Sequence, residues 1–455
     1  MNKPFLWGSS ISGGQCEGGF ASRSATVVDV IPQGKDTRFA FMNNPGIYIN
    51  QQPQDNYTSQ VGVEFYSHYK EDIALYAKLG LKALRFSVLW SRVFLDENMV
   101  ENEEGLKFYD NVIDELIKHG IEPVITTIHF DMPLWLVKKY NGFANRKAVE
   151  LYQKYVETIV KRYHDRVKYW ISFCEINVMN HALYMVGGAI VQQGENREQV
   201  LHQCAYHKLL ANAWLVKTCH EIDPTLQVGC EVAGTPCYPL TSSPKDYQLM
   251  VESERSNNRY TDVMVNGRYP YYFLKEMLEY GIEMKAEDLE ILKENTLDFI
   301  AVSYYKSGLA SHEGVTSNPC LEKTAFGWTI DPEGFRIMLN NMYERYEVPI
   351  LVVENGLGTY DKVEDGQIHD KYRIDYLAKH IEQMKLAIQD GVNVIGYLTW
   401  AAMDLVSTTE GMMSKRYGFI YVDRTDDDPK ECKRIRKDSF YWYKNVIQSN
   451  GNELD

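Results

Sequence analysis

The chain has 455 residues, of which 45% are hydrophobic, and a formal net charge of −14 at pH 7. This acidic balance argues against nucleic acid as the main partner, and an anionic substrate would need a local basic pocket. No run of about 18 apolar residues is present and residues 1–8 lack the apolar core of a signal peptide, so we expect no membrane span and no secretion. Eight cysteines without metal-like spacing predict reduced thiols and a cytoplasmic protein.

Short apolar runs alternate with amphipathic helical patterns along the whole chain. The candidate strands are 5–9, 83–88, 123–128, 169–173, 227–232, 299–304, 350–353 and 394–400. Helical periodicity is visible at 65–79, 105–119, 146–163, 199–221 and 372–390. Eight such units predict an α/β fold, a (β/α)8 TIM barrel, as a single catalytic domain over residues 1–455. The long aperiodic segment 25–60, rich in Pro, Gly, Asn and Gln, predicts an elaborated βα loop over the barrel mouth.

Polar or aromatic side chains stand at the C-terminal ends of seven candidate strands. That end of a (β/α)8 barrel carries the chemistry. In chain order these residues are Gln15, Arg85, His129, Glu175, Tyr304, Glu354 and Trp400. One His or Arg at a strand end is more often structural, but seven such groups together favour a functional site.

Two of these groups are glutamates that follow buried strands. A barrel would gather Glu175 and Glu354 at one mouth, although each alone could form an interior salt bridge. Paired carboxyl groups are the equipment for glycoside hydrolysis, one as acid and base and the other as nucleophile. In the retaining version we expect them about 5–5.5 Å apart.

The two carboxyl groups need different surroundings for this chemistry. The nucleophile has to be ionised, so it needs cationic and hydroxyl neighbours, for which Arg85 and Tyr304 are the candidates. The acid has to hold its proton near neutral pH, which an apolar setting favours. Trp170, Phe173 and Ile176 flank Glu175 in the sequence.

The two glutamate motifs carry a family resemblance. With Val353-Glu354-Asn355-Gly356 and Phe173-Cys174-Glu175-Ile176-Asn177, the chain resembles glycoside hydrolase family 1, retaining β-glycosidases, nearly end to end. The resemblance implies Glu354 as nucleophile and Glu175 as acid/base, with no metal and no organic cofactor. It further implies sugar binding by Gln15, His129, Cys174 and Trp400, and orientation of the nucleophile by Arg85 and Tyr304.

A second resemblance concerns the substrate. Where members acting on plain glycosides carry a sugar-binding Glu, this chain has Ser407. Ser407, Lys415 and Tyr417 resemble the phosphate-binding set of the 6-phospho-β-glycosidases, and we expect them to converge beside Trp400. A hydroxyl and an ammonium donate to a phosphate that a carboxylate would repel. The other interpretation of Lys415 is a solvated surface charge.

The substrate implied is therefore a small phosphorylated β-glycoside, of the kind phosphorylated during import into a bacterial cytoplasm. Thr408 stands where 6-phospho-β-galactosidases tend to place Trp, which favours 6-phospho-β-glucosides. A 6-phospho-β-galactosidase or an enzyme of dual specificity is the alternative.

Cys174 is a departure from the family pattern, which has Asn before the acid/base glutamate. That Asn donates to the sugar 2-hydroxyl, whereas a thiol is a weak donor. We expect the Cys174 side chain to point into the sugar subsite near C2. The substitution allows a weak hydrolase, a substrate altered at C2, or a protein that only binds or senses phosphoglycosides.

Overall fold

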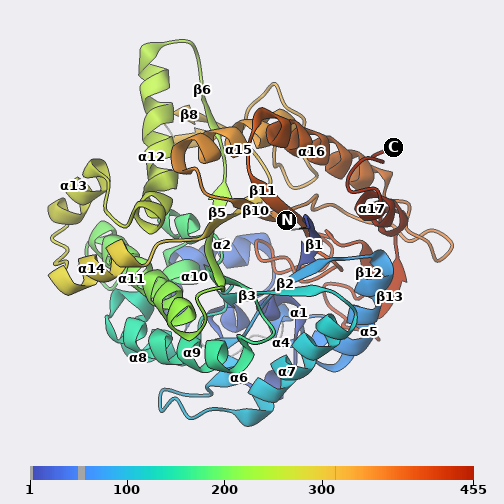
Figure 1. The fold of residues 1–455 in the computed structure, drawn as a ribbon, viewed down its shortest axis with the longest axis horizontal. Coiled ribbons are helices and arrows are strands. Elements are labelled where there is room, and N and C mark those ends of the chain that lie inside the picture. The colour runs from blue at the N-terminus through green and yellow to red at the C-terminus, as the bar shows by residue number, and fades with distance from the viewer. Residues whose placement is uncertain (1–3, 50–56, 313) are drawn as a thin grey trace.

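The computed structural model describes residues 4–49, 57–312 and 314–455, and a closed barrel of parallel strands lies at its centre (Figure 1). The barrel strands are β1 (Leu6–Ser10), β2 (Ala83–Ser87), β3 (Glu122–Ile128), β4 (Tyr169–Phe173), β5 (Gln227–Gly234), β7 (Phe299–Tyr304), β10 (Ile350–Asn355) and β11 (Val394–Trp400). Their order around the barrel is β1-β11-β10-β7-β5-β4-β3-β2. All eight predicted strands are confirmed, and so is the (β/α)8 fold class.

Helices surround the barrel on its outer side, as Figure 1 shows. The main ones are α5 (Phe65–Leu79), α7 (Glu103–Lys118), α9 (Lys147–Tyr163), α11 (Arg197–Ile222), α15 (Pro332–Tyr346), α16 (Lys371–Asp390) and α17 (Asp438–Gln448). The five predicted helices are confirmed to within two residues at each end. Between β5 and β7 the chain adds α12 (Pro244–Asn266), α13 (Tyr271–Glu279) and α14 (Ala286–Glu294).

The strands divide their side chains between two apolar regions. One face of each strand fills the barrel interior, where Phe299, Ala301, Leu351 and Val353 belong to one cluster. Residues between them, such as Ile300, belong to the larger cluster that includes the helices. This alternation with a period of two decides which strand-end residues can face into the barrel mouth.

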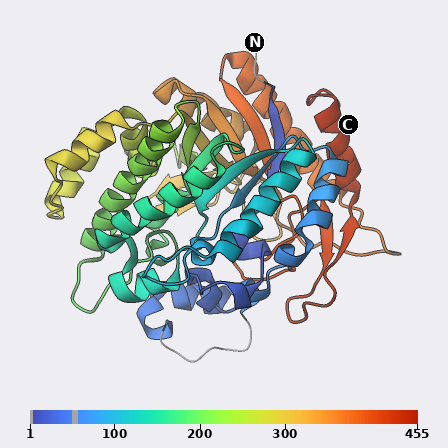
Figure 2. The same ribbon diagram turned by 60° about the horizontal axis from the view of Figure 1, so that its bottom comes forward.

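The described parts of segment 25–60 lie beside the loop that follows β11, as expected of an elaborated βα loop, and contain short helices that the sequence did not predict. These helices are η2 (Val27–Val30), α2 (Lys35–Asn43), α3 (Pro45–Tyr48) and α4 (Thr58–Val61), while residues 50–56 lie outside the described part. Gly34 N donates to Glu410 O at 2.9 Å, and Arg38 Nε donates to Thr408 O at 3.0 Å. The segment therefore supports the loop that follows β11, and Figure 2 shows its blue helices gathered at one end of the molecule.

Two small sheets extend the βα loops, and the sequence patterns did not predict them. They are formed by β6 (Cys237–Pro239), β8 (Gly308–Ser311) and β9 (Gly314–Thr316), and by β12 (Ile420–Asp423) and β13 (Lys433–Arg436). Within the described ranges no helix combines the length and apolar character needed to cross a bilayer.

Candidate active site

Glu354 lies near the end of β10, where the strand register changes. Val352 pairs with Val302 but Glu354 pairs with Ser303, so β10 holds one extra residue there. Such a bulge re-aims a side chain, and it brings the carboxyl group to the same side as Val353. Arg85 Nη1 donates to Glu354 Oε1 at 2.5 Å. Burial raises the pKa of Glu354, while Arg85 and Tyr305 oppose that rise and favour the carboxylate.

The second oxygen of Glu354 is held by Tyr305, which corrects one prediction. Tyr305 donates its hydroxyl to Glu354 Oε2 at 2.7 Å, whereas the Tyr304 hydroxyl donates to the backbone of Asp331 at 2.6 Å. Tyr304 packs on Phe335 of α15, with ring centroids 4.8 Å apart. Because Ser303 faces inward, the next residue on the strand faces the helices, so the expected role of Tyr304 at the nucleophile was wrong.

Two glycines after Glu354 allow neighbouring groups to approach the chain closely. A Cβ on Gly356 would lie 2.0 Å from the Trp400 carbonyl oxygen, and one on Gly358 would lie 2.6 Å from Cζ of Tyr417. Both contacts are far shorter than real side chains show. The turn after β10 therefore packs closely against Trp400 and Tyr417.

Glu175 follows β4 in a left-handed backbone conformation, with φ 38°. Positive φ is uncommon for a residue with a side chain and is concentrated at functional sites. Its carboxyl oxygen Oε1 accepts a hydrogen bond from Ser303 Oγ at 2.5 Å. Burial, together with the negative charge of Glu354, raises the pKa of Glu175 to about 7. This is the protonation behaviour that a general acid requires near neutral pH.

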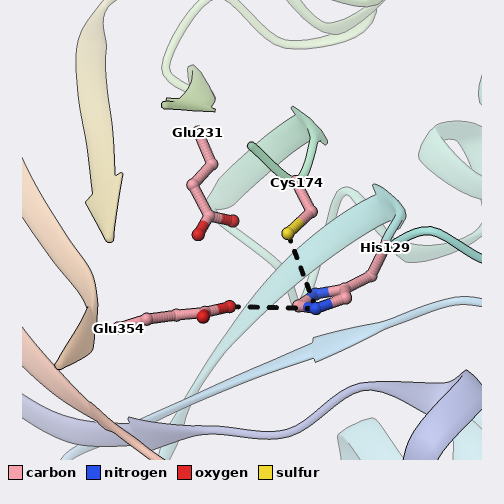
Figure 3. A group of neighbouring side chains, drawn as sticks. All are labelled: His129, Cys174, Glu231 and Glu354. Atoms are coloured by element: carbon pink, nitrogen blue, oxygen red, sulfur yellow. Dashed lines mark hydrogen bonds and ion pairs between the residues drawn. The ribbon is translucent and has the colours of Figure 1, made fainter. Parts of the chain in front are cut away.

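Cys174 points into the mouth beside His129, as Figure 3 shows. The Cys174 sulfur lies 3.5 Å from His129 Nε2, and the same nitrogen lies 3.8 Å from Glu354 Oε1. Burial and the nearby Arg85 lower the pKa of His129 well below its usual value, so the ring is neutral. Burial raises the pKa of the Cys174 thiol, and Glu231 and Glu354 raise it further, so the thiol keeps its proton.

Four buried side chains each offer an atom that could bind a metal ion, and these atoms all lie within 4.8 Å of one another. They belong to His129, Cys174, Glu231 and Glu354. This set has the chemistry of a transition-metal site. Arg85 lies among the same groups, however, and donates to both Glu231 and Glu354. The guanidinium already supplies the cation to both carboxyl groups, so a metal ion would have to compete with it.

Trp400 and Gln15 complete this side of the mouth. The Trp400 ring stacks on His129, with centroids 5.3 Å apart and an interplanar angle of 16°. Gln15 lies in α1 (Gly13–Cys16), accepts a hydrogen bond from Ser12 at 2.7 Å and donates to Val406 O at 2.6 Å. Gln15 thus contacts the backbone directly before Ser407, while Cys174, His129 and Trp400 contact one another in turn.

The predicted phosphate set holds an unexpected carboxylate. Ser407 Oγ donates to Glu410 Oε2 at 2.8 Å, and Lys415 Nζ lies 3.0 Å from the same oxygen. The Lys415 side chain is only 1% exposed, which rules out a solvated surface charge. Its ammonium stands 4.2 Å from the Trp328 ring centroid and 5.9 Å from that of Tyr417.

Sequence reasoning missed four residues that contact the predicted site residues. They are Glu231, Ser303, Tyr305 and Glu410. Glu231 had a visible signal, since it is one acid inside the apolar run of β5, the barrel strand that carries none of the seven predicted strand-end residues. Alternation along β7 would have selected Ser303. Glu410 gave no signal, because its contacts depend on the fold of a loop.

The comparisons with known proteins agree with this geometry. The model of glycosyl hydrolase family 1 matches residues 1–452. The aryl-phospho-beta-D-glucosidase BglH of Bacillus subtilis (strain 168) is 45% identical, covering 99% of this chain and 98% of the relative. A 6-phospho-beta-glucosidase of Clostridium longisporum is 42% identical, covering 100% and 98%.

A solved structure is similar over the same extent. The beta-glucosidase from Thermotoga maritima in complex with castanospermine aligns with a TM-score of 0.85 at 32% identity, covering 100% of this chain and 99% of that one. A match of sequence and structure over both full lengths leaves one assignment: the chain belongs to glycosyl hydrolase family 1.

Proposed function

We propose that the chain is a 6-phospho-β-glucosidase, which hydrolyses 6-phospho-β-D-glucosides to glucose 6-phosphate and an aglycone or sugar with retention of configuration. The observation that carries the substrate is Lys415, an ammonium buried at the barrel mouth beside the hydroxyls of Ser407 and Thr409. The relatives named as phospho-β-glucosidases, and a phospho-cellobiase of Klebsiella oxytoca at 40% identity, support the gluco rather than the galacto alternative.

The proposed reaction has two displacements. Glu354 attacks the anomeric carbon while Glu175 gives its proton to the glycosidic oxygen, which leaves with the aglycone. Glu175, now a carboxylate, takes a proton from water as the water oxygen attacks the same carbon and releases Glu354. Arg85 and Tyr305 hold the Glu354 carboxylate before the first step and receive it again after the second.

We further propose that the whole chain forms one catalytic domain in the cytoplasm. The barrel strands extend from Leu6 to Trp400, and α17 packs back against α5 and α16. The Tyr443 hydroxyl of α17 donates to Gly8 O of β1 at 2.9 Å. These contacts join the end of the chain to its first strand.

The substrate assignment is tested with 4-nitrophenyl β-glucoside, the corresponding galactoside, and the 6-phosphate of each. We expect the 6-phosphoglucoside to have the highest kcat/KM. Lys415→Ala should raise KM for this substrate about tenfold or more while changing weak turnover of the plain glucoside much less. Equal loss on both substrates would remove the phosphate role. Lys362→Ala is the matched control, since it breaks an exposed Lys–Glu pair.

The stereochemical course is tested by proton NMR of the first-formed product. Retention releases the β anomer of glucose 6-phosphate before mutarotation, whereas initial release of the α anomer would show a single displacement and exclude Glu354 as nucleophile.

A further inference from the structure

The donors that we assign to the substrate phosphate are already occupied by a side chain of the same loop. Glu410 accepts hydrogen bonds from Ser407 Oγ at 2.8 Å and from the hydroxyl of Thr409. Lys415 Nζ contacts its two carboxylate oxygens at 3.0 and 3.3 Å. A carboxylate thus takes the position, among two hydroxyls and one ammonium, where a phosphate group would bind.

The charge state of Glu410 follows from these contacts. Burial alone would raise the pKa of Glu410, but Thr409, Lys415 and Ser407 together hold it below its usual range, so the group is ionised. Glu410 and Lys415 form a compensated ion pair in a largely buried setting, with side chains 10% and 1% exposed. A phosphate dianion placed on the same donors would meet a like charge at contact distance.

Three hydrogen bonds hold the backbone around Glu410, so its side chain can exchange with a ligand by rotating alone. Gly411 N donates to Ser407 O at 2.7 Å and Gly34 N donates to Glu410 O at 2.9 Å. Thr58 Oγ1 donates to Gly411 O at 2.7 Å. The donor positions would therefore persist after the carboxylate rotates away.

Further cations are available to the ligand once Glu410 has moved. Burial lowers the pKa of Lys415, and Glu410 opposes this effect. The positive charges of Lys306 and Lys35 lower the pKa further, so both lysines lie within electrostatic reach of Lys415. Removal of the carboxylate leaves an excess of positive charge around these donors, which matches a dianionic group.

We propose that Glu410 is an internal competitor for the phosphate subsite and a specificity-determining residue of this chain. Free enzyme binds the 6-phosphate only in the fraction of molecules whose Glu410 side chain has left the donors, so the apparent affinity is reduced by that fraction. When the substrate has no phosphate, the Glu410 carboxylate stays on these donors and neutralises Lys415. The enzyme therefore incurs a smaller penalty for binding plain glucosides than it would with an unpaired Lys415. The inference rests on the proposed function and adds a second determinant to it.

The test compares the wild type with Glu410→Gln and Glu410→Ala. For each protein we would measure KM for 4-nitrophenyl 6-phospho-β-glucoside and for 4-nitrophenyl β-glucoside, and the affinity for glucose 6-phosphate by calorimetry. Both variants should show about tenfold lower KM for the phosphorylated substrate and about tenfold tighter binding of glucose 6-phosphate. KM for the plain glucoside should not fall.

Two outcomes overturn the inference. They are an unchanged or higher KM for the phosphorylated substrate in both variants, and an equal fall of KM for both substrates. Glu364→Gln is the matched control, because it removes the same charge from an exposed pair with Lys362, 2.7 Å apart, and should change neither KM. A wild type inactive on phosphorylated glucosides would instead refute the proposed function. Calorimetry with glucose 6-phosphate would then still decide whether Glu410 competes.

Discussion

At the scale of single residues, the site is governed by three carboxyl groups around one guanidinium. Burial lowers the pKa of Arg85, but Glu231 and Glu354 together raise it above its usual value, so this cation is permanent. One positive charge cannot balance three buried negative charges, so protons must remain on part of the cluster. The pKa values of Glu175 and Glu231 are accordingly both raised.

The pH dependence of catalysis should follow the protonation state of Glu175. Its pKa of about 7 predicts that kcat/KM falls as pH rises above 7, because the acid form is lost. Glu175→Gln should remove this limb and lower kcat by roughly 10²–10⁴-fold on substrates with poor leaving groups, and less on nitrophenyl substrates. Steady-state profiles between pH 5 and pH 9 measure both effects. A basic limb that persists in the variant would assign it to another group.

Replacement of Cys174 by Asn is expected to increase hydrolytic activity. The Cys174 thiol lies 3.5 Å from His129 Nε2, where we propose that the sugar binds, and is a weak donor. Cys174→Asn should therefore raise kcat/KM on 6-phosphoglucosides, by about tenfold for each 1.4 kcal/mol of transition-state stabilisation recovered. Cys320→Ser, at the exposed cysteine, is the control. A variant no faster than wild type would indicate a pocket adapted to the thiol, or a substrate altered at C2. If the wild type and the variant both bind phosphoglycosides without hydrolysing them, the alternative of a sensing protein would be favoured.

At the scale of elements, irregular strand ends place Glu175 and Glu354. The extra residue in β10 aims Glu354 into the mouth, and the left-handed conformation of Glu175 turns the chain after β4. Strict alternation alone would not have put both carboxyl groups on the inner face. On β7 the alternation is regular, and it separates two adjacent tyrosines onto opposite sides of the barrel wall.

The two tyrosines therefore make a matched pair of variants. Tyr305→Phe removes a hydrogen bond to Glu354 Oε2 and should lower kcat about tenfold or more. Tyr304→Phe removes a hydrogen bond to the backbone of Asp331, away from Glu354, and should lower the melting temperature while leaving kcat within about twofold. Kinetics and thermal unfolding of both proteins decide the assignment. The reverse pattern would restore Tyr304 to the site.

At the scale of the whole molecule, the buried acids make folding stability depend on pH. Burial raises the pKa of Glu231 well above its usual value, and Glu354 and Glu175 add to this although Arg85 opposes it. Between the unfolded and the folded pKa the native state holds a proton that the unfolded chain has lost. The free energy of unfolding contributed by Glu231 consequently falls as pH rises through this range.

Glu231→Gln should remove that contribution, because the amide stays neutral at every pH. We expect the variant to melt at least about 2 °C above the wild type at pH 8, with a difference that shrinks toward pH 4. Thermal unfolding at several pH values measures this. If the variant were instead less stable than the wild type, and by more at pH 8 than at pH 4, Glu231 would be ionised in the native state.

The sequence by itself determined the barrel, its strands and main helices, and the positions of Glu175 and Glu354 at strand ends. Those features depend on local periodicity and on strand-end position, which one chain displays directly. The tertiary structure decided which neighbours those residues meet. Tyr305 rather than Tyr304 reaches Glu354 because side chains alternate, and Glu410 contacts Ser407 and Lys415 because a loop folds back on itself. Contacts between segments distant in sequence, such as Arg85 with Glu231, are set by barrel closure, which no local pattern encodes.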